Sequence, residues 1–189
     1  MVETISPVVH GGRNRNYWTT IALHTLGATA SAGLLGALLG AAGWVLGAPW
    51  GSAGYVLIAL TALIYFAREA FGAPIPLPQL RRQVPEWWRA FYSRNVAALL
   101  YGLGLGIAFM TYLSFGTFVV VAVGALATGH PGLGALIVGA FGLSRGFSIA
   151  AQVPVGRLDH LAQSHRPRVI NATTVGAVAL TAMSSVVLR

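Results

Sequence analysis

The longest uncharged stretch of this chain runs 35 residues, from Asn95 to Gly129, and it limits the possible folds most strongly. A helix needs only about 20 residues to cross the bilayer core. The stretch is too long for one straight crossing and too short for two crossings with a turn. Near its centre lies a small, hydroxyl-rich patch, Thr111 to Thr117. Irregular backbone inside lipid needs protein or water around it, so the patch predicts one long broken helix, either kinked or re-entrant.

Composition places the chain among membrane proteins. Hydrophobic residues make up 56% and charged residues only 8%, against about 25% charged in soluble domains. A soluble chain of this kind would expose large apolar patches. The net charge of +8 would suggest nucleic-acid binding in a soluble protein. Here the arginines lie between apolar segments, where they orient the chain and contact anionic lipids. The sequence therefore predicts an all-α, polytopic transmembrane bundle that contacts the lipid bilayer and no nucleic acid.

The arginines also predict the number of crossings. A polar N-terminus, 1–16, precedes a single transmembrane domain, 17–189, with apolar segments at 17–46, 53–67, 95–129, 133–151 and 169–188. If the long stretch crosses once, the arginines of 1–16, 68–94 and 157–168 share one side, and the other side has only uncharged turns and Arg189. Cytoplasmic loops carry the excess of basic residues. We therefore expect five net crossings of the plasma (inner) membrane, with the N-terminus in the cytoplasm.

The cytoplasmic loop 68–94 contains a short aromatic segment. Residues 85–94 suit a helix with proline in its first turn. Four aromatic residues share one face of it by the i, i+4 rule and suit a helix in the membrane interface: Trp87, Trp88, Phe91 and Tyr92. An ordinary aromatic belt is the alternative interpretation.

Glycines recur at helical spacing in two of the apolar segments. The spacing of 3 and 4 residues places each set on one face of its helix. Small-residue faces let helices approach closely in lipid. We therefore expect helix packing, within the monomer, at a dimer seam or on a sliding surface, by Gly33, Gly36, Gly40, Gly43, Gly139, Gly142 and Gly146. By contrast, Gly102, Gly104 and Gly106 are spaced by two and predict a locally weak helix.

Several of these segments resemble a known family. Residues 26–40 and 54–58 resemble the second and third helices of the CcdA/DsbD cytochrome-c-biogenesis transmembrane family. Residues 100–106 with Thr111 resemble its fourth helix, and 141–146 its glycine-arginine motif. The resemblance implies a related membrane scaffold lacking its first helix. The family passes electrons through a pair of membrane cysteines, but this chain has no cysteine, and Leu113 stands at one of the two positions. Thiol-disulfide transfer is therefore not expected.

The polar residues inside the segments are the candidate site. Thr111, Ser114 and Thr117 could line a substrate path, or could hydrogen-bond to carbonyls freed by a kink. Arg145 lies about 20 Å from the outer end of its segment, where an arginine could hold an anionic substrate or extend to the cytoplasmic interface. His24 is the one histidine within a segment. It faces no second histidine, so a packing role is favoured over metal or haem binding.

These observations leave two functions open. No acidic residue lies well inside a segment, and the sequence carries no nucleophile triad, phosphate loop or zinc signature. We therefore expect no enzyme, no metal and no cofactor. The favoured hypothesis is transporter-like binding or translocation of a small neutral or anionic solute. The alternative is a non-catalytic membrane subunit or assembly factor of a larger membrane complex, of the cytochrome-biogenesis type that the resemblance implies. Either would act as a homo-oligomer or with a partner membrane protein.

Overall fold

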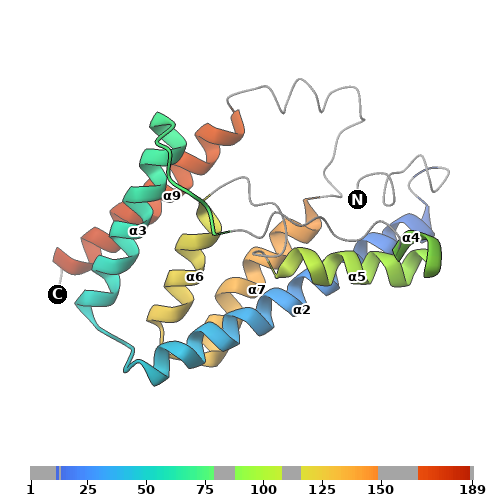
Figure 1. The fold of residues 1–189 in the computed structure, drawn as a ribbon, viewed down its shortest axis with the longest axis horizontal. Helices are drawn as coiled ribbons and strands as arrows, with labels where there is room; N and C mark the ends of the chain where they lie inside the picture. The colour runs from blue at the N-terminus through green and yellow to red at the C-terminus, as the bar shows by residue number, and fades with distance from the viewer. Residues whose placement is uncertain (1–11, 13, 79–87, 108–115, 149–165, 188–189) are drawn as a thin grey trace. The chain divides into compact units, whose positions relative to one another are not determined.

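All secondary structure in the described residues is helical. The computed structural model describes residues 12, 14–78, 88–107, 116–148 and 166–187. The helices, labelled as in Figure 1, are α2 (Arg15–Val45), α3 (Ser52–Phe71), α4 (Trp88–Phe91), α5 (Arg94–Gly106), α6 (Thr117–Ala127), α7 (Pro131–Phe147) and α9 (Arg166–Val187). The prediction of an all-helical chain is confirmed for these residues.

Three of the described helices are long and apolar enough to cross a membrane. They are α2, α3 and, within α9, the segment Val169–Val186, whereas α6 and α7 are apolar but shorter. A helix of 31 residues such as α2 is about 46 Å long, which matches the thickness of a bilayer with its headgroups. The described helices therefore fit association with a membrane. The count of five crossings and the side of the N-terminus stay predictions.

The long uncharged stretch contains two separate helices. Helix α5 ends at Gly106, and α6 begins at Thr117. Two of the candidate residues, Thr111 and Ser114, lie outside the described residues. The two helices belong to different compact units of the chain, one made of 1–35, 79–112 and 138–152, and the other of 36–78, 113–137 and 153–189.

In the first unit, α5 and α7 each pack closely against α2. A Cβ atom added to Gly102 or Gly106 of α5 would collide with the α2 backbone near His24 and Ala28. On α7, a Cβ at Gly142 would collide with Ala28 and Ala32. These glycines let helix backbones touch, which is how helices associate in lipid. Gly102 and Gly106 thus serve packing, a role that the prediction of a weak helix did not include.

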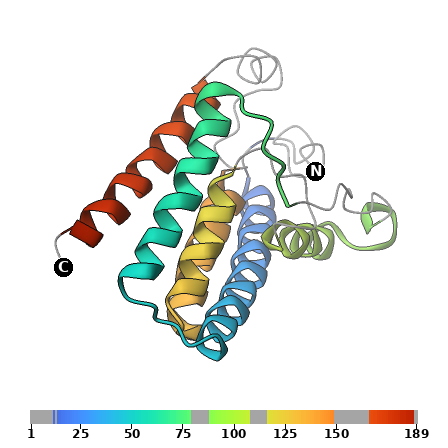
Figure 2. The same cartoon turned by 60° about the vertical axis from the view of Figure 1, so that its left-hand side comes forward.

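In the second unit, α3 lies beside α9, and α6 packs against both (Figure 2). Small and aromatic side chains fill the space between them, with a core of Ala62, Tyr65, Val120, Val175 and Ala179. The carbonyls of Leu126 and His130 approach Gly43 and Gly40 of α2. Gly47 lies beyond the end of α2, in the turn before α3, with φ of +80°. The same three helices carry the polar groups described next.

Candidate functional site

A buried carboxylate joins two helices of the second unit. The Glu69 side chain, in the last turn of α3, is only 3% exposed. Its Oε1 atom lies 2.6 Å from a guanidinium nitrogen of Arg68 and accepts a hydrogen bond of 3.1 Å from the backbone N–H of Gly116. Gly116 is the N-cap residue of α6, where the free N–H groups of a helix favour negative charge. Glu69 therefore fixes the start of α6 against the end of α3.

A proline-rich strap of residues 73–78 follows the end of α3 and is bound to the same cluster. Arg68 Nε donates to the Ile75 carbonyl at 3.0 Å, and the Tyr65 hydroxyl donates to the Pro76 carbonyl at 3.3 Å. Ile75 and Leu77 pack on the core. Every second residue of the strap is proline, which has no N–H to satisfy. The strap is thus held on the core of this unit and has few backbone donors to satisfy.

The first residue of α6 also bonds to α9. The Thr117 hydroxyl donates to Oδ1 of Asn171 at 2.8 Å. A hydrogen bond between helices in lipid is worth about 0.6 kcal/mol on average. Thr117, a candidate for solute contact, is thus engaged within the protein.

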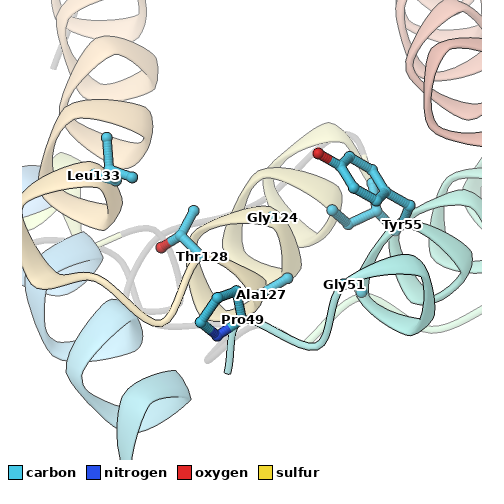
Figure 3. A pocket seen from close by; sticks show the side chains of 9 residues that line it. Pro49, Gly51, Tyr55, Gly124, Ala127, Thr128 and Leu133 are labelled. Carbon is cyan, nitrogen blue, oxygen red and sulfur yellow. The ribbon is translucent and has the colours of Figure 1, made fainter. Parts of the chain in front are cut away.

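The second unit also has an open groove between α3, α6 and the start of α7. Its volume is about 470 Å³, and Figure 3 shows Pro49, Tyr55, Gly124, Thr128 and Leu133 around it. The lining includes no charged residue. Gly124 lies in the interior of α6, yet a Cβ added there would meet nothing within 4 Å. The groove can therefore accept an apolar segment that approaches the α6 backbone.

The first unit holds a second set of buried polar groups. His24 is fully buried, with Nδ1 3.2 Å from the Ala98 carbonyl. Its Nε2 atom, like the Thr25 hydroxyl, has no hydrogen-bond partner among the described residues. The Thr20 hydroxyl bonds the Asn16 carbonyl at 2.8 Å and reaches Asn95 at 3.3 Å. Thr20 and His24 thus form a polar seam with Asn95 and Ala98 between α2 and α5, whereas Thr25 lies towards α7. The part of the chain that the structure describes contains no cluster of three metal-ligating side chains.

The predicted substrate residues are divided between the two units. Arg145 is a half-buried residue of α7 in the first unit, and Thr117 belongs to the second.

The predicted interfacial helix corresponds to α4, at Trp88–Phe91. The centre of the Trp88 ring lies 5.7 Å from that of Tyr101. Phe91 is 78% exposed. Tyr92 is also exposed and follows α4, and Trp87 lies outside the described residues.

Sequence reasoning missed Glu69. The apolar pattern placed the end of its segment at Ala67, whereas α3 continues to Phe71. Only four acidic residues occur in the chain, and this one directly follows an arginine at the end of an apolar segment. The rarity of acidic residues was the one signal in the sequence that could have identified Glu69 as a candidate. Its partner, Gly116, is 47 positions away, and the sequence pattern does not reveal such a contact.

Comparison with known proteins gives one consistent result. The chain is similar to the methylamine utilization protein MauF. Identity is 32% over 155 residues with the protein from Paracoccus versutus, covering 80% of this chain and 57% of the relative. With the protein from Paracoccus denitrificans, identity is 31% over 170 residues, which cover 88% of this chain and 60% of the relative. With the protein from Methylobacillus flagellatus, identity is 34% over 132 residues, which cover 69% of this chain and 47% of the relative.

The chain thus spans about half to three fifths of the length of these relatives. No family model matches the chain. No solved structure matches it either.

The similarity to MauF corrects the assignment to the CcdA/DsbD family, which is wrong. The relatives found at 31–34% identity all have the name MauF. The misleading signal was composition: leucine- and glycine-rich helices share short patterns because lipid favours the same residues in unrelated proteins.

Proposed function

We propose that this chain is a non-catalytic membrane accessory protein that serves methylamine utilization by binding a partner protein. The similarity to proteins named for methylamine utilization carries the proposal. This function matches the subunit or assembly-factor hypothesis better than solute translocation. It also favours a partner protein over a second copy of the chain.

The second unit supports binding over transport. Polar groups around the start of α6 bond within the protein: Glu69 pairs with Arg68 and accepts from the Gly116 backbone N–H, and Thr117 donates to Asn171. A solute path needs groups that exchange water for substrate, whereas these groups fix helices to each other. The groove of the same unit has an uncharged lining.

We place the partner contact at this groove, with an apolar membrane helix as its occupant. A glycine inside a helix costs about 1 kcal/mol relative to alanine, and no packing within the described chain requires Gly124, since a Cβ there would meet nothing within 4 Å. In lipid, such an opening lets a second backbone approach closely. The uncharged lining matches an apolar helix better than a charged loop.

Filling the groove is expected to impair function without unfolding the protein. Gly124→Phe puts a ring into open space, whereas Gly124→Ala leaves most of the groove open. Both variants should reach the wild-type yield of folded protein in detergent, but only Gly124→Phe should slow growth on methylamine. Normal growth of a well-folded Gly124→Phe variant would exclude the groove as the contact.

The proposed topology has five crossings, with the N-terminus in the cytoplasm, and single-cysteine labelling tests it. The chain has no cysteine, so each substitution creates a unique thiol. In intact cells, a membrane-impermeant maleimide should label Ser52→Cys. It should label Ser93→Cys and Ser164→Cys only after the membrane is permeabilised. Labelling of the last two from opposite sides would disprove this topology.

The function itself is tested by deleting the gene in the organism that encodes the chain. We expect growth to stop on methylamine and to continue on a carbon and nitrogen source that bypasses it, with recovery when the gene is restored. Unchanged growth on methylamine would refute the proposal.

A further inference from the structure

A second groove lies in the first unit, between α2 and α7, and the proposed function does not use it. Its volume is about 430 Å³, and its walls are almost entirely apolar, including Trp18, Ala22, Leu26, Leu143 and Phe147. Leu26 and Phe147 are more than half exposed, at 60% and 56%, so the groove opens on the outer surface of this unit. Thr29 lines it too, and its hydroxyl bonds the Thr25 carbonyl at 2.8 Å.

A charged residue lies in line with one end of this groove. Arg15 begins α2, and residues 15, 18, 22, 25 and 29 follow each other at spacings of 3 or 4, which places them on one helix face. The helix start is fixed, because Asn14 Oδ1 accepts a hydrogen bond of 3.0 Å from the Tyr17 N–H. Arg15 is exposed. Arg15 is not part of the groove lining, but it lies on the same face of α2, three residues before Trp18, the first lining residue.

The depths of these residues match the layers of a bilayer. Helix α2 is as long as a bilayer with its headgroups, so an α2 that crosses perpendicular to the membrane would have its first residue, Arg15, at headgroup level. Trp18 is about 4.5 Å deeper along the helix, at the interface that tryptophan prefers. Thr29 is about 21 Å from Arg15, well inside the hydrocarbon core. A phospholipid has the same order of groups: charged head, interfacial region and apolar chain.

We infer that the α2–α7 groove is a binding site for an anionic phospholipid, with an acyl chain along Ala22 and Leu26 and the phosphate at Arg15. A partner helix is the less suitable occupant, because it would place apolar surface beside the exposed guanidinium. The inference requires a membrane setting but does not depend on the role in methylamine utilization.

Native mass spectrometry of the full chain in mild detergent tests the inference. The probes are phosphatidylglycerol and phosphatidylcholine with identical acyl chains. We expect the wild type to retain phosphatidylglycerol preferentially. Arg15→Gln should weaken that retention about fivefold, the equivalent of about 1 kcal/mol per basic residue, and should leave phosphatidylcholine unchanged. Arg94→Gln, which removes an exposed charge at the start of α5, is the matched control and should have a smaller effect.

A second variant tests the apolar part of the site. Ala22→Phe fills the groove from an exposed position and should reduce retention of both lipids to background. Leu60→Phe, at a 54% exposed position of α3, should not. If Ala22→Phe fails to fold, Leu143→Trp fills the same groove from α7. Undiminished retention in a folded groove-filling variant, or equal retention of the two lipids by the wild type, would overturn the inference.

Discussion

Gly142→Ala is expected to destabilise the protein strongly although it adds a single methyl group. The added Cβ would lie 2.6 Å from the Ala28 carbonyl oxygen and would collide with the Ala32 side chain. Backbone and Cβ atoms cannot rotate away, so α7 must move off α2. Overpacking of this kind costs about 1–3 kcal/mol, which exceeds the gain of up to about 1 kcal/mol from replacing a helical glycine by alanine. A thermal melt of the detergent-solubilised protein measures the difference.

Gly139→Ala is the matched control on the same helix. A Cβ there would lie 3.6 Å from its nearest neighbour, the Gly33 Cα atom, which is ordinary van der Waals contact. The helix propensity gain should therefore dominate, and the melting temperature should stay equal or rise. Equal stability of Gly142→Ala and the wild type would contradict the packing described for α2 and α7.

Glu69→Ala is expected to have the second large effect, by separating α3 from the start of α6. The substitution leaves the buried Gly116 N–H without its acceptor and Arg68 without its ion-pair partner. The Arg68 side chain is 25% exposed and can regain water, so the cost should fall below that of a fully buried broken pair. We expect a loss of about 1–3 kcal/mol, measured by chemical unfolding in mixed micelles.

The double-mutant cycle of Glu69→Gln and Arg68→Gln separates the two interactions. Glutamine at position 69 keeps an oxygen that can accept from Gly116 but loses the charge, so an intermediate cost is expected. The two substitutions should be less damaging together than the sum of the single effects, because each alone already breaks the ion pair. Strictly additive effects would show that the pair contributes no coupling energy.

Apolar pattern and length were enough to predict an all-helical chain, and three of the described helices are long and apolar enough to cross a membrane. The segments at 17–46 and 53–67 correspond closely to α2 and α3, which end at Val45 and Phe71. Within the long uncharged stretch, α5 and α6 are separate helices, whereas most of the hydroxyl-rich patch expected to break it lies outside the described residues. These features depend on local composition, which a sequence displays directly.

Features that depend on contacts between distant residues were not predictable in the same way. Glu69 joins two helices because it accepts a hydrogen bond from Gly116. Gly102 serves packing because the backbone of α2 near His24 lies directly against it. The glycine spacing of two suggested weakness, but Gly102 and Gly106 are one turn apart and share a face towards α2. The resemblance of the glycine- and leucine-rich segments also suggested the wrong family, because the same small and branched residues suit most membrane helices.

The uptake of labelled methylamine by the deletion strain tests the central claim most directly. An accessory protein that binds a partner is not needed to move the solute, so we predict that the strain cannot grow on methylamine but takes it up at the wild-type initial rate. An initial uptake rate that falls together with growth, and returns when the gene is restored, would contradict this account and favour transport.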